Sequence, residues 1–248
     1  MKLNNKIAII TGGASGFGAG IVTKFINEGA KVVIADMNID LAQELAAELG
    51  DNAMAVEVDV SDGNDVKKMV DKVLKAHGTI DIVVNNAGIG HIPQPLDELS
   101  EGDFERIFNV NAKSVYLTCQ HVVPIMKKAG HGAILNVAST GGVSPRPNLT
   151  WYNASKGWMI TATKGMAVEL APFGIRVNAI NPVAGETPLL KTFMGEDTPE
   201  IRAKFLSTIP IGRFSTPEDM GNAACFLCSE EASMVTGVAM EVDGGRCI

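Results

Sequence analysis

Short runs rich in valine and isoleucine alternate with longer segments of helical periodicity along almost the whole chain. We predict strands over residues 6–11, 31–35, 53–58, 80–84, 133–137, 175–180 and 237–242. We predict helices over residues 16–28, 39–49, 62–76, 151–170 and 217–228, and a long helix within 101–128. Apolar strands separated by helices are typical of a parallel sheet that is covered on both faces. The alternation therefore predicts an α/β fold, a single Rossmann-type domain over residues 1–248 with a doubly wound, mostly parallel sheet.

The segment 183–215 departs from this alternation. It is rich in proline, glycine, threonine and charged residues, and we expect only one short helix in it, around residues 199–207. A long irregular segment after the carboxyl end of a strand is typical of a lid over a binding site. We therefore predict a substrate lid around residues 183–215.

The charge balance narrows the choice of partner. The 248 residues carry a formal net charge of −7, which argues against nucleic acid or an anionic membrane surface. No apolar stretch is long enough to span a bilayer, and the first residues lead directly into a strand without room for a signal peptide. We therefore expect a cytoplasmic protein.

The four cysteines should be reduced in that compartment. Cys225 and Cys228 form a Cys-x-x-Cys pair inside an apolar run, and we interpret them as small core residues rather than as redox or zinc ligands. The four histidines show no metal-ligand spacing, so no metal site is expected.

A glycine-rich segment, Thr-Gly-Gly-Ala-Ser-Gly-Phe-Gly over residues 11–18, joins the first predicted strand to the first helix. The spacing of Gly12, Gly16 and Gly18 is Gly-x-x-x-Gly-x-Gly and not the strict dinucleotide fingerprint. Glycines at such a turn still allow a pyrophosphate to approach the helix N-terminus. The alternative is an ordinary glycine-rich turn.

Asp36 follows the second strand, where a carboxylate can accept hydrogen bonds from the ribose hydroxyls of a dinucleotide. The same carboxylate would repel the 2′-phosphate of NADP, and neither Met37 nor Ser15 is basic. We therefore predict NAD as the cofactor. As an alternative or additional role, Asp36 would cap the following helix.

Tyr152 and Lys156 are four residues apart on a predicted helix, and Ser139 lies thirteen residues before the tyrosine. Residues i and i+4 share one helix face, so the phenol and the ammonium can reach one site. A nearby cation should lower the pKa of the Tyr152 phenol, which would then act as a general acid or base. The Ser139 hydroxyl would bind the same substrate oxygen. The alternative for the isolated pair is a solvated helix face.

Taken in order, these motifs resemble the short-chain dehydrogenase/reductase family over nearly the whole chain. The further matches are Asp59 after the third strand, the run Asn85-Asn86-Ala87-Gly88 after the fourth, and Asn111 in Asn-Val-Asn-Ala. The resemblance implies an oxidoreductase that transfers a hydride between NAD(H) and an alcohol, aldehyde or ketone, and a homotetramer.

The resemblance also implies a role for each matching residue. Tyr152 would be the general acid/base, Ser139 would orient the substrate oxygen, and Lys156 would bind the nicotinamide ribose. Asn111 would hold a water molecule of a proton relay. The implied cofactor contacts are Gly12, Ser15, Gly16, Phe17, Gly18, Asp36, Met37, Asp59, Val60, Asn86, Ala87, Gly88, Tyr152, Lys156, Pro182, Val183 and Thr187. Val183 departs from the family's usual Pro-Gly after strand six, which puts the local backbone in doubt.

The substrate is less clearly encoded. Candidate lining residues are Ile89, His91, Thr140, Arg146, Trp151, Val183 and the stretch 186–193. His91 could reach a polar group and Arg146 a carboxylate or sulfonate, or both could lie at the surface. Runs such as Leu-Thr-Trp-Tyr and Phe-Met-Gly-Glu-Asp resemble a subgroup that includes formylbenzenesulfonate dehydrogenase. The alternatives are a 3-oxoacyl-carrier-protein reductase that uses NADP(H) and a non-catalytic nucleotide-binding relative.

Overall fold

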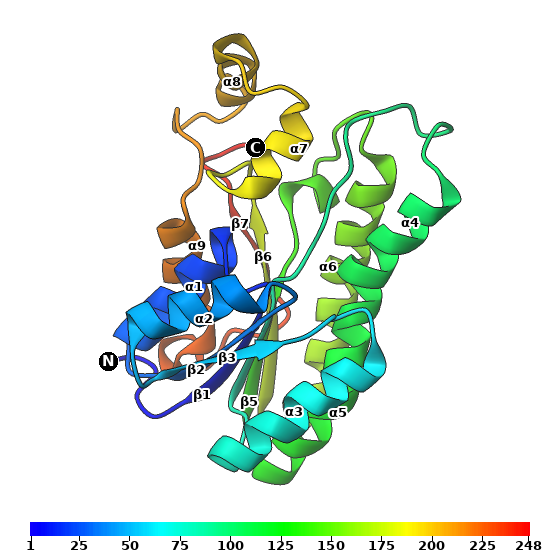
Figure 1. Ribbon diagram of the computed structural model, residues 1–248. Helices are drawn as coiled ribbons and strands as arrows, with labels where there is room; N and C mark the ends of the chain where they lie inside the picture. The colour runs from blue at the N-terminus through cyan, green and yellow to red at the C-terminus, as the bar shows by residue number, and fades with distance from the viewer.

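A seven-stranded parallel sheet forms the centre of the molecule, with helices packed on both of its faces (Figure 1). The computed structural model describes residues 1–248. The strand order is β3-β2-β1-β4-β5-β6-β7 and every pairing is parallel. The strands are β1 Ile7–Thr11, β2 Lys31–Asp36, β3 Ala53–Glu57, β4 Ile82–Asn85, β5 Gly132–Val137, β6 Ile175–Pro182 and β7 Ala239–Val242. The predicted doubly wound sheet is confirmed.

The direction of winding reverses between β1 and β4. Strands β2 and β3 follow β1 on one side, whereas β4 pairs with β1 on its other side. Ligands of open α/β sheets bind where the winding reverses, outside the carboxyl ends of the strands. The glycine-rich segment follows β1 and the Asn-Asn-Ala-Gly run follows β4, so the topology brings these two segments together.

Alternate residues of each strand enter two separate cores. In β1, Ala8 and Ile10 belong to one core, and Ile7 and Ile9 belong to the other. The first core is completed by helices α1 Gly16–Asn27, α2 Ile39–Leu49 and α9 Pro217–Cys228. The second is completed by α3 Gly63–His77, α5 Ser114–Ala129 and α6 Thr150–Leu170. The central strands are largely apolar because both of their faces are buried, whereas the edge strand β7 carries the exposed Glu241.

Cys225 and Cys228 are 1% and 6% exposed in the first core, which confirms their interpretation as core residues. No helix combines the length and the apolar character that crossing a bilayer requires. The cytoplasmic location stays a prediction.

The long helix expected within residues 101–128 is interrupted. Helix α4, Glu101–Phe108, leads into a π-helical turn, Asn109–Lys113, and only then into α5. A π-turn adds a residue to the ring closed by each hydrogen bond, and such turns occur frequently at functional sites. Here the turn contains Asn111.

The segment 183–215 contains two helices, so the expectation of a single short helix was wrong. Helix α8, Pro199–Leu206, matches the predicted one, and α7, Pro188–Met194, was not predicted. A proline at the first helical position and Gly195 at φ 73° after the last residue bound α7. Figure 1 shows α7 and α8 beyond the carboxyl ends of the strands. They enclose a small apolar cluster of Val183, Leu190, Met194, Ile209 and Phe214.

Candidate active site

A cavity of about 530 Å³ opens at the carboxyl ends of the strands. It extends from the glycine-rich segment and the end of β2, past the ends of β4 and β5, to α6 and helices α7 and α8. All seventeen residues predicted to contact the cofactor line this cavity. Ser139, Tyr152 and Lys156 line it as well, and Asn111 lies behind its wall.

The glycine-rich segment forms a tight cradle at the N-terminus of α1. Gly12 and Gly16 have φ values of +60° and +53°, which residues with a side chain rarely adopt. A β-carbon on Gly18 would lie 2.0 Å from the carbonyl oxygen of Gly12. The Ser15 side chain makes no capping hydrogen bond to the first turn of α1. The backbone N–H groups there are therefore available to an anion such as a pyrophosphate, and the site fits a dinucleotide.

Hydrogen bonds fasten the segment after β4 to the glycine-rich segment. The Asn86 amide donates to the carbonyl oxygens of Thr11 and Gly12, both at 2.9 Å. The Thr11 hydroxyl accepts the backbone N–H groups of Asn86 at 3.0 Å and Ala87 at 3.1 Å. This role of Thr11 was not predicted, although a threonine at the end of the first strand is the available signal.

The Asp36 carboxylate is held at the other end of the cavity by backbone N–H groups. Ala14 donates to one oxygen and Asn38 to the other, both at 3.0 Å. Helix α2 is capped by Asn38, which accepts the N–H of Leu41 at 3.1 Å, so the capping role considered for Asp36 was wrong. A smaller hollow adjoins this end of the cavity, and its lining contains one cation, Lys68. The Lys68 ammonium is paired with the Asp65 carboxylate at 2.8 Å.

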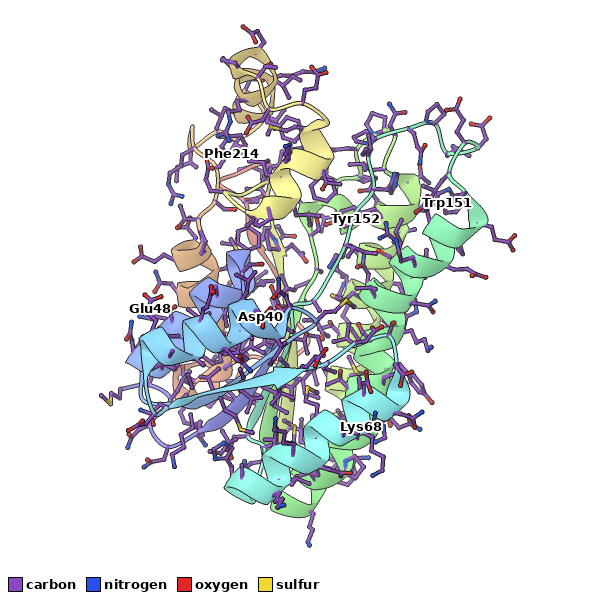
Figure 2. The ribbon with its side chains drawn as sticks, in the orientation of Figure 1. Asp40, Glu48, Lys68, Trp151, Tyr152 and Phe214 are labelled. Carbon is purple, nitrogen blue, oxygen red and sulfur yellow. The ribbon has the colours of Figure 1, made fainter.

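Tyr152, labelled in Figure 2, is 6% exposed on α6. Lys156 lies four residues further along the same helix face and is 4% exposed. The Lys156 ammonium donates to the carbonyl oxygen of Val137 at the end of β5, at 2.9 Å. The Ser139 hydroxyl, two residues further along, accepts the N–H of Gly141 at 3.0 Å. The Tyr152 ring packs against Phe193 of α7, with ring centroids 4.9 Å apart. A solvated helix face is therefore excluded for the Tyr152–Lys156 pair.

Burial dominates the titration of both groups. It lowers the pKa of Lys156 to about 8, because the ammonium loses its hydration. Burial also raises the pKa of Tyr152, and the Ser139 hydroxyl and the Arg146 guanidinium act in the opposite direction without reversing the shift. The expectation that Lys156 brings the pKa of Tyr152 below its usual value is therefore not met in this structure.

Asn111 connects three elements behind the cavity. Its side chain accepts the N–H of Ile89 at 2.9 Å and donates to the Ile89 carbonyl at 2.9 Å and to the Ser155 hydroxyl at 3.0 Å. Ser155 in turn donates to the carbonyl oxygen of Tyr152 at 2.7 Å. The π-helical turn thus links the segment after β4 to the first turns of α6.

Some of the predicted substrate contacts line the cavity and others do not. The predicted residues that line the cavity are Ile89, Thr140, Arg146, Val183, Thr187, Pro188, Leu189, Leu190, Thr192 and Phe193. Trp151 does not, because its indole donates to the carbonyl of Leu96 at 2.9 Å on the α4 side of the helix (Figure 2). His91 is also outside the lining and is buried beside the Ile92 carbonyl. Residues that were not predicted also line the cavity, among them Leu149, Asn153 and Phe205.

Val183 fits the backbone that usually carries glycine in this family. Its N–H donates to the carbonyl of Val242 at 3.3 Å and its side chain is 4% exposed in the apolar cluster below α7. The displaced glycine, Gly185, lies against Phe17, and a β-carbon on it would approach that ring to 2.4 Å. The valine side chain is therefore accommodated by the apolar cluster, while the backbone of residue 183 bonds to β7.

The fold and the site together define a dinucleotide-binding α/β oxidoreductase. The profile of the family described as enoyl-(acyl carrier protein) reductase matches residues 12–246. The chain belongs to the short-chain dehydrogenase/reductase family, whose members use a nicotinamide cofactor.

Three relatives are similar over their full length. A 4-formylbenzenesulfonate dehydrogenase from Comamonas testosteroni is 49% identical, with 100% of each chain covered. A 3-oxoacyl-[acyl-carrier-protein] reductase from Thermotoga maritima is 41% identical, again with 100% of each covered. The crystal structure of a 3-ketoacyl-(acyl-carrier-protein) reductase from Brucella melitensis complexed with NADH has 51% identity and a TM-score of 0.95, covering 99% of this chain and 100% of that one.

The lowered pKa of Lys156 predicts how stability depends on pH. The folded protein holds this proton less tightly than the unfolded chain, whose lysine titrates near 10.5, so the unfolded state binds more protons between pH 8 and 10.5. The free energy of unfolding of the wild type should therefore rise across this window by up to about 3 kcal/mol relative to Lys156→Met. Urea titrations at several pH values measure this difference.

Lys164→Met is the control, because Lys164 is exposed on the same helix. Its difference from the wild type should not change with pH. A constant difference between the wild type and Lys156→Met across the window would contradict the assignment of a destabilised buried ammonium.

Proposed function

We propose that this oxidoreductase is an NAD(H)-dependent dehydrogenase/reductase of small alcohols, aldehydes or ketones. The observation that carries the proposal is the burial of Tyr152 and Lys156 in one cavity with the glycine cradle and Asp36. When bound, the nicotinamide supplies hydride chemistry at a carbinol or carbonyl carbon, while the protein handles the proton on oxygen.

Tyr152 is the proposed general acid and base. In reduction it gives its phenolic proton to the carbonyl oxygen, and in oxidation it accepts the proton of the alcohol. Ser139 donates a hydrogen bond to that oxygen and fixes its position. Lys156 binds the nicotinamide ribose. Asn111 holds the water through which the proton returns to solvent.

The cofactor proposal rests on the charges of the cavity. The cradle of Gly12, Gly16 and Gly18 receives the pyrophosphate, and Asp36 accepts the hydroxyls of the adenosine ribose. A 2′-phosphate at that place would face the Asp36 carboxylate, and the neighbouring Lys68 is already paired with Asp65. These charges favour NAD(H) over NADP(H), and the NADH in the Brucella relative agrees with them.

The names of the relatives support a small carbonyl substrate and also suggest an alternative function, reduction of an acyl-carrier-protein substrate. A 4-formylbenzenesulfonate dehydrogenase and a cyclopentanol dehydrogenase act on small molecules, whereas two other relatives are named as acyl-carrier-protein reductases. The charges around Asp36 disfavour an NADP(H)-dependent acyl-carrier-protein reductase.

We further propose that residues 183–215 act as the substrate lid, since Leu189, Phe193 and Phe205 of this segment close one side of the cavity.

Tyr152→Phe removes the proposed proton donor and keeps the ring. We expect turnover to fall by about 10³-fold, within the range that general acid–base catalysis contributes, with NADH affinity changed by less than about twofold. A screen of alcohols and carbonyls followed by NADH absorbance measures turnover, and fluorescence titration measures binding.

Tyr116→Phe is the matched control, because Tyr116 is the other tyrosine of the chain and is 56% exposed on α5. It should keep wild-type turnover. If Tyr152→Phe turns over as fast as the wild type, Tyr152 is not the acid/base.

Asp36→Ser tests the cofactor preference without a substrate. The wild type should bind NADH more tightly than NADPH, and the variant should narrow the ratio of the two dissociation constants by about 30-fold, or about 2 kcal/mol. Asp40→Asn, an exposed carboxylate on α2, removes the same charge outside the cavity and should leave the ratio unchanged. Equal affinity of the wild type for NADH and NADPH would refute the role of Asp36.

We also propose a homotetramer, because helices α4 to α6 expose large apolar side chains that a neighbouring subunit would cover. These are Phe104, Tyr116, Trp158 and Val168. Light scattering should give four times the 26.1 kDa mass of one chain. A monomer at micromolar concentration would contradict the proposal.

A further inference from the structure

We infer that Arg146 is an anion-binding residue at the substrate end of the cavity, and that the substrate is a small alcohol or carbonyl compound carrying a carboxylate or sulfonate. This inference rests on the proposed function and specifies its substrate class.

The segment that carries Arg146 is fixed to the helix that carries Tyr152. Pro145 and Pro147 flank the arginine and restrict its backbone. The side-chain amide of Asn153, the neighbour of Tyr152, donates to the carbonyl oxygen of Arg146 at 2.8 Å. Arg146 and Tyr152 both line the cavity, and the guanidinium is close enough to act on the titration of the phenol.

The Arg146 guanidinium is not paired with any carboxylate of the protein. The exposed arginines Arg106, Arg202 and Arg213 each lie within 4.0 Å of an aspartate or glutamate. Arg146 forms no such pair and its side chain donates no hydrogen bond to the protein. Its guanidinium lies over the ring of Phe205, 4.6 Å from the centroid. Stacking occupies a face of the guanidinium and leaves its N–H edge free, which is the geometry that binds a carboxylate or sulfonate through two hydrogen bonds.

A second cation reinforces the positive potential. Arg246, near the C-terminus, donates to the Ser144 hydroxyl at 3.1 Å, two residues before Arg146. Burial first, and then repulsion by Arg246, lower the pKa of Arg146, because both disfavour the charged guanidinium. An anion placed on the N–H edge would remove this penalty, so the two arginines favour an anionic ligand.

The acidic residues of the cavity lie at its opposite end. Asp36 and Asp59 are the two carboxylates in the lining, where Asp36 ends β2 and Asp59 follows β3 at the cofactor end. Glu186, on the lid segment, is outside the lining and pairs with Arg202 at 3.3 Å. The substrate end therefore presents Arg146 and Lys156 without an opposing acid, in a chain whose net charge is −7.

Aromatic rings limit the size and nature of the rest of the substrate. Phe193 lies against Tyr152 and Phe205 lies against Arg146, so each polar contact point has an apolar ring beside it. A compact apolar body with a carbonyl at one end and an anionic group at the other satisfies both points. The 4-formylbenzenesulfonate named for one relative has this form and serves as the probe.

The test compares an anionic aldehyde with its neutral isostere. The rate constant kcat/KM is measured with NADH for 4-formylbenzenesulfonate and for 4-formylbenzenesulfonamide, which is uncharged at pH 7. We expect the wild type to favour the anion by about 30-fold, the range of a hydrogen-bonded charge, and Arg146→Gln to reduce this ratio to about one. Arg146→Lys keeps the charge but not the two-point geometry and should give an intermediate ratio.

Arg106→Gln is the matched control, because it removes an arginine charge from the exposed surface of α4. It should leave the ratio as in the wild type. A structural role of Arg146 as a support for Phe205 would lower both rates together and would not move the ratio. An unchanged ratio in Arg146→Gln overturns the inference and leaves the proposed function intact.

Calorimetry separates failure of the inference from failure of the proposed function. The probes are 4-(hydroxymethyl)benzenesulfonate and the corresponding sulfonamide, titrated into the protein with and without NADH. If the wild type binds the anion more tightly than the sulfonamide and Arg146→Gln loses this difference, the anion site is supported. Absence of aldehyde turnover alongside that result would refute the proposed function alone. Equal binding of the two probes to the wild type overturns the inference.

Discussion

Burial of the sheet on both faces is the constraint on which the rest of the molecule depends. The central strands send alternate side chains into two apolar cores, so few polar groups can be accommodated along their length. Of the buried asparagines, Asn181 alone has a side chain without a hydrogen-bond partner. The others are paired, as where Asn85 donates to Asn136 at 2.9 Å and Asn136 donates to Thr163 at 2.8 Å. Free polar groups gather beyond the carboxyl ends of the strands, and the reversal of winding between β1 and β4 opens the space in which they meet.

The same burial makes the Tyr152–Lys156 site depend on its supports. A buried ammonium is destabilised unless it has hydrogen-bond acceptors, and the protein provides one, the carbonyl oxygen of Val137. The π-helical turn contributes Asn111, whose bonds to Ile89 and Ser155 hold α6 against the segment after β4. An uninterrupted α-helix would place position 111 differently, so the geometry of the site depends on the π-helical turn.

The sequence predicted the strands and most helices because burial on two faces leaves a direct signal in the pattern of apolar residues. It predicted the cavity residues where a motif lies at the end of a strand, as for Asp36. It did not predict α7, since seven residues are too few for helical periodicity to stand out. Trp151 was a foreseeable error, because consecutive helical residues point about 100° apart and Tyr152 already faces the cavity. The contact of Arg146 with Phe205 joins residues far apart in the chain, and no spacing encodes it.

The two ends of the cavity carry opposite charge. Asp36 and Asp59 make one end acidic, and Arg146 and Lys156 make the other basic, although the whole chain is acidic. At the acidic end the carboxylates accept hydrogen bonds from hydroxyls, whereas the basic end attracts anions. Tyr152 lies in the basic half, where the Arg146 guanidinium acts to lower the pKa of the phenol against the larger, raising effect of burial.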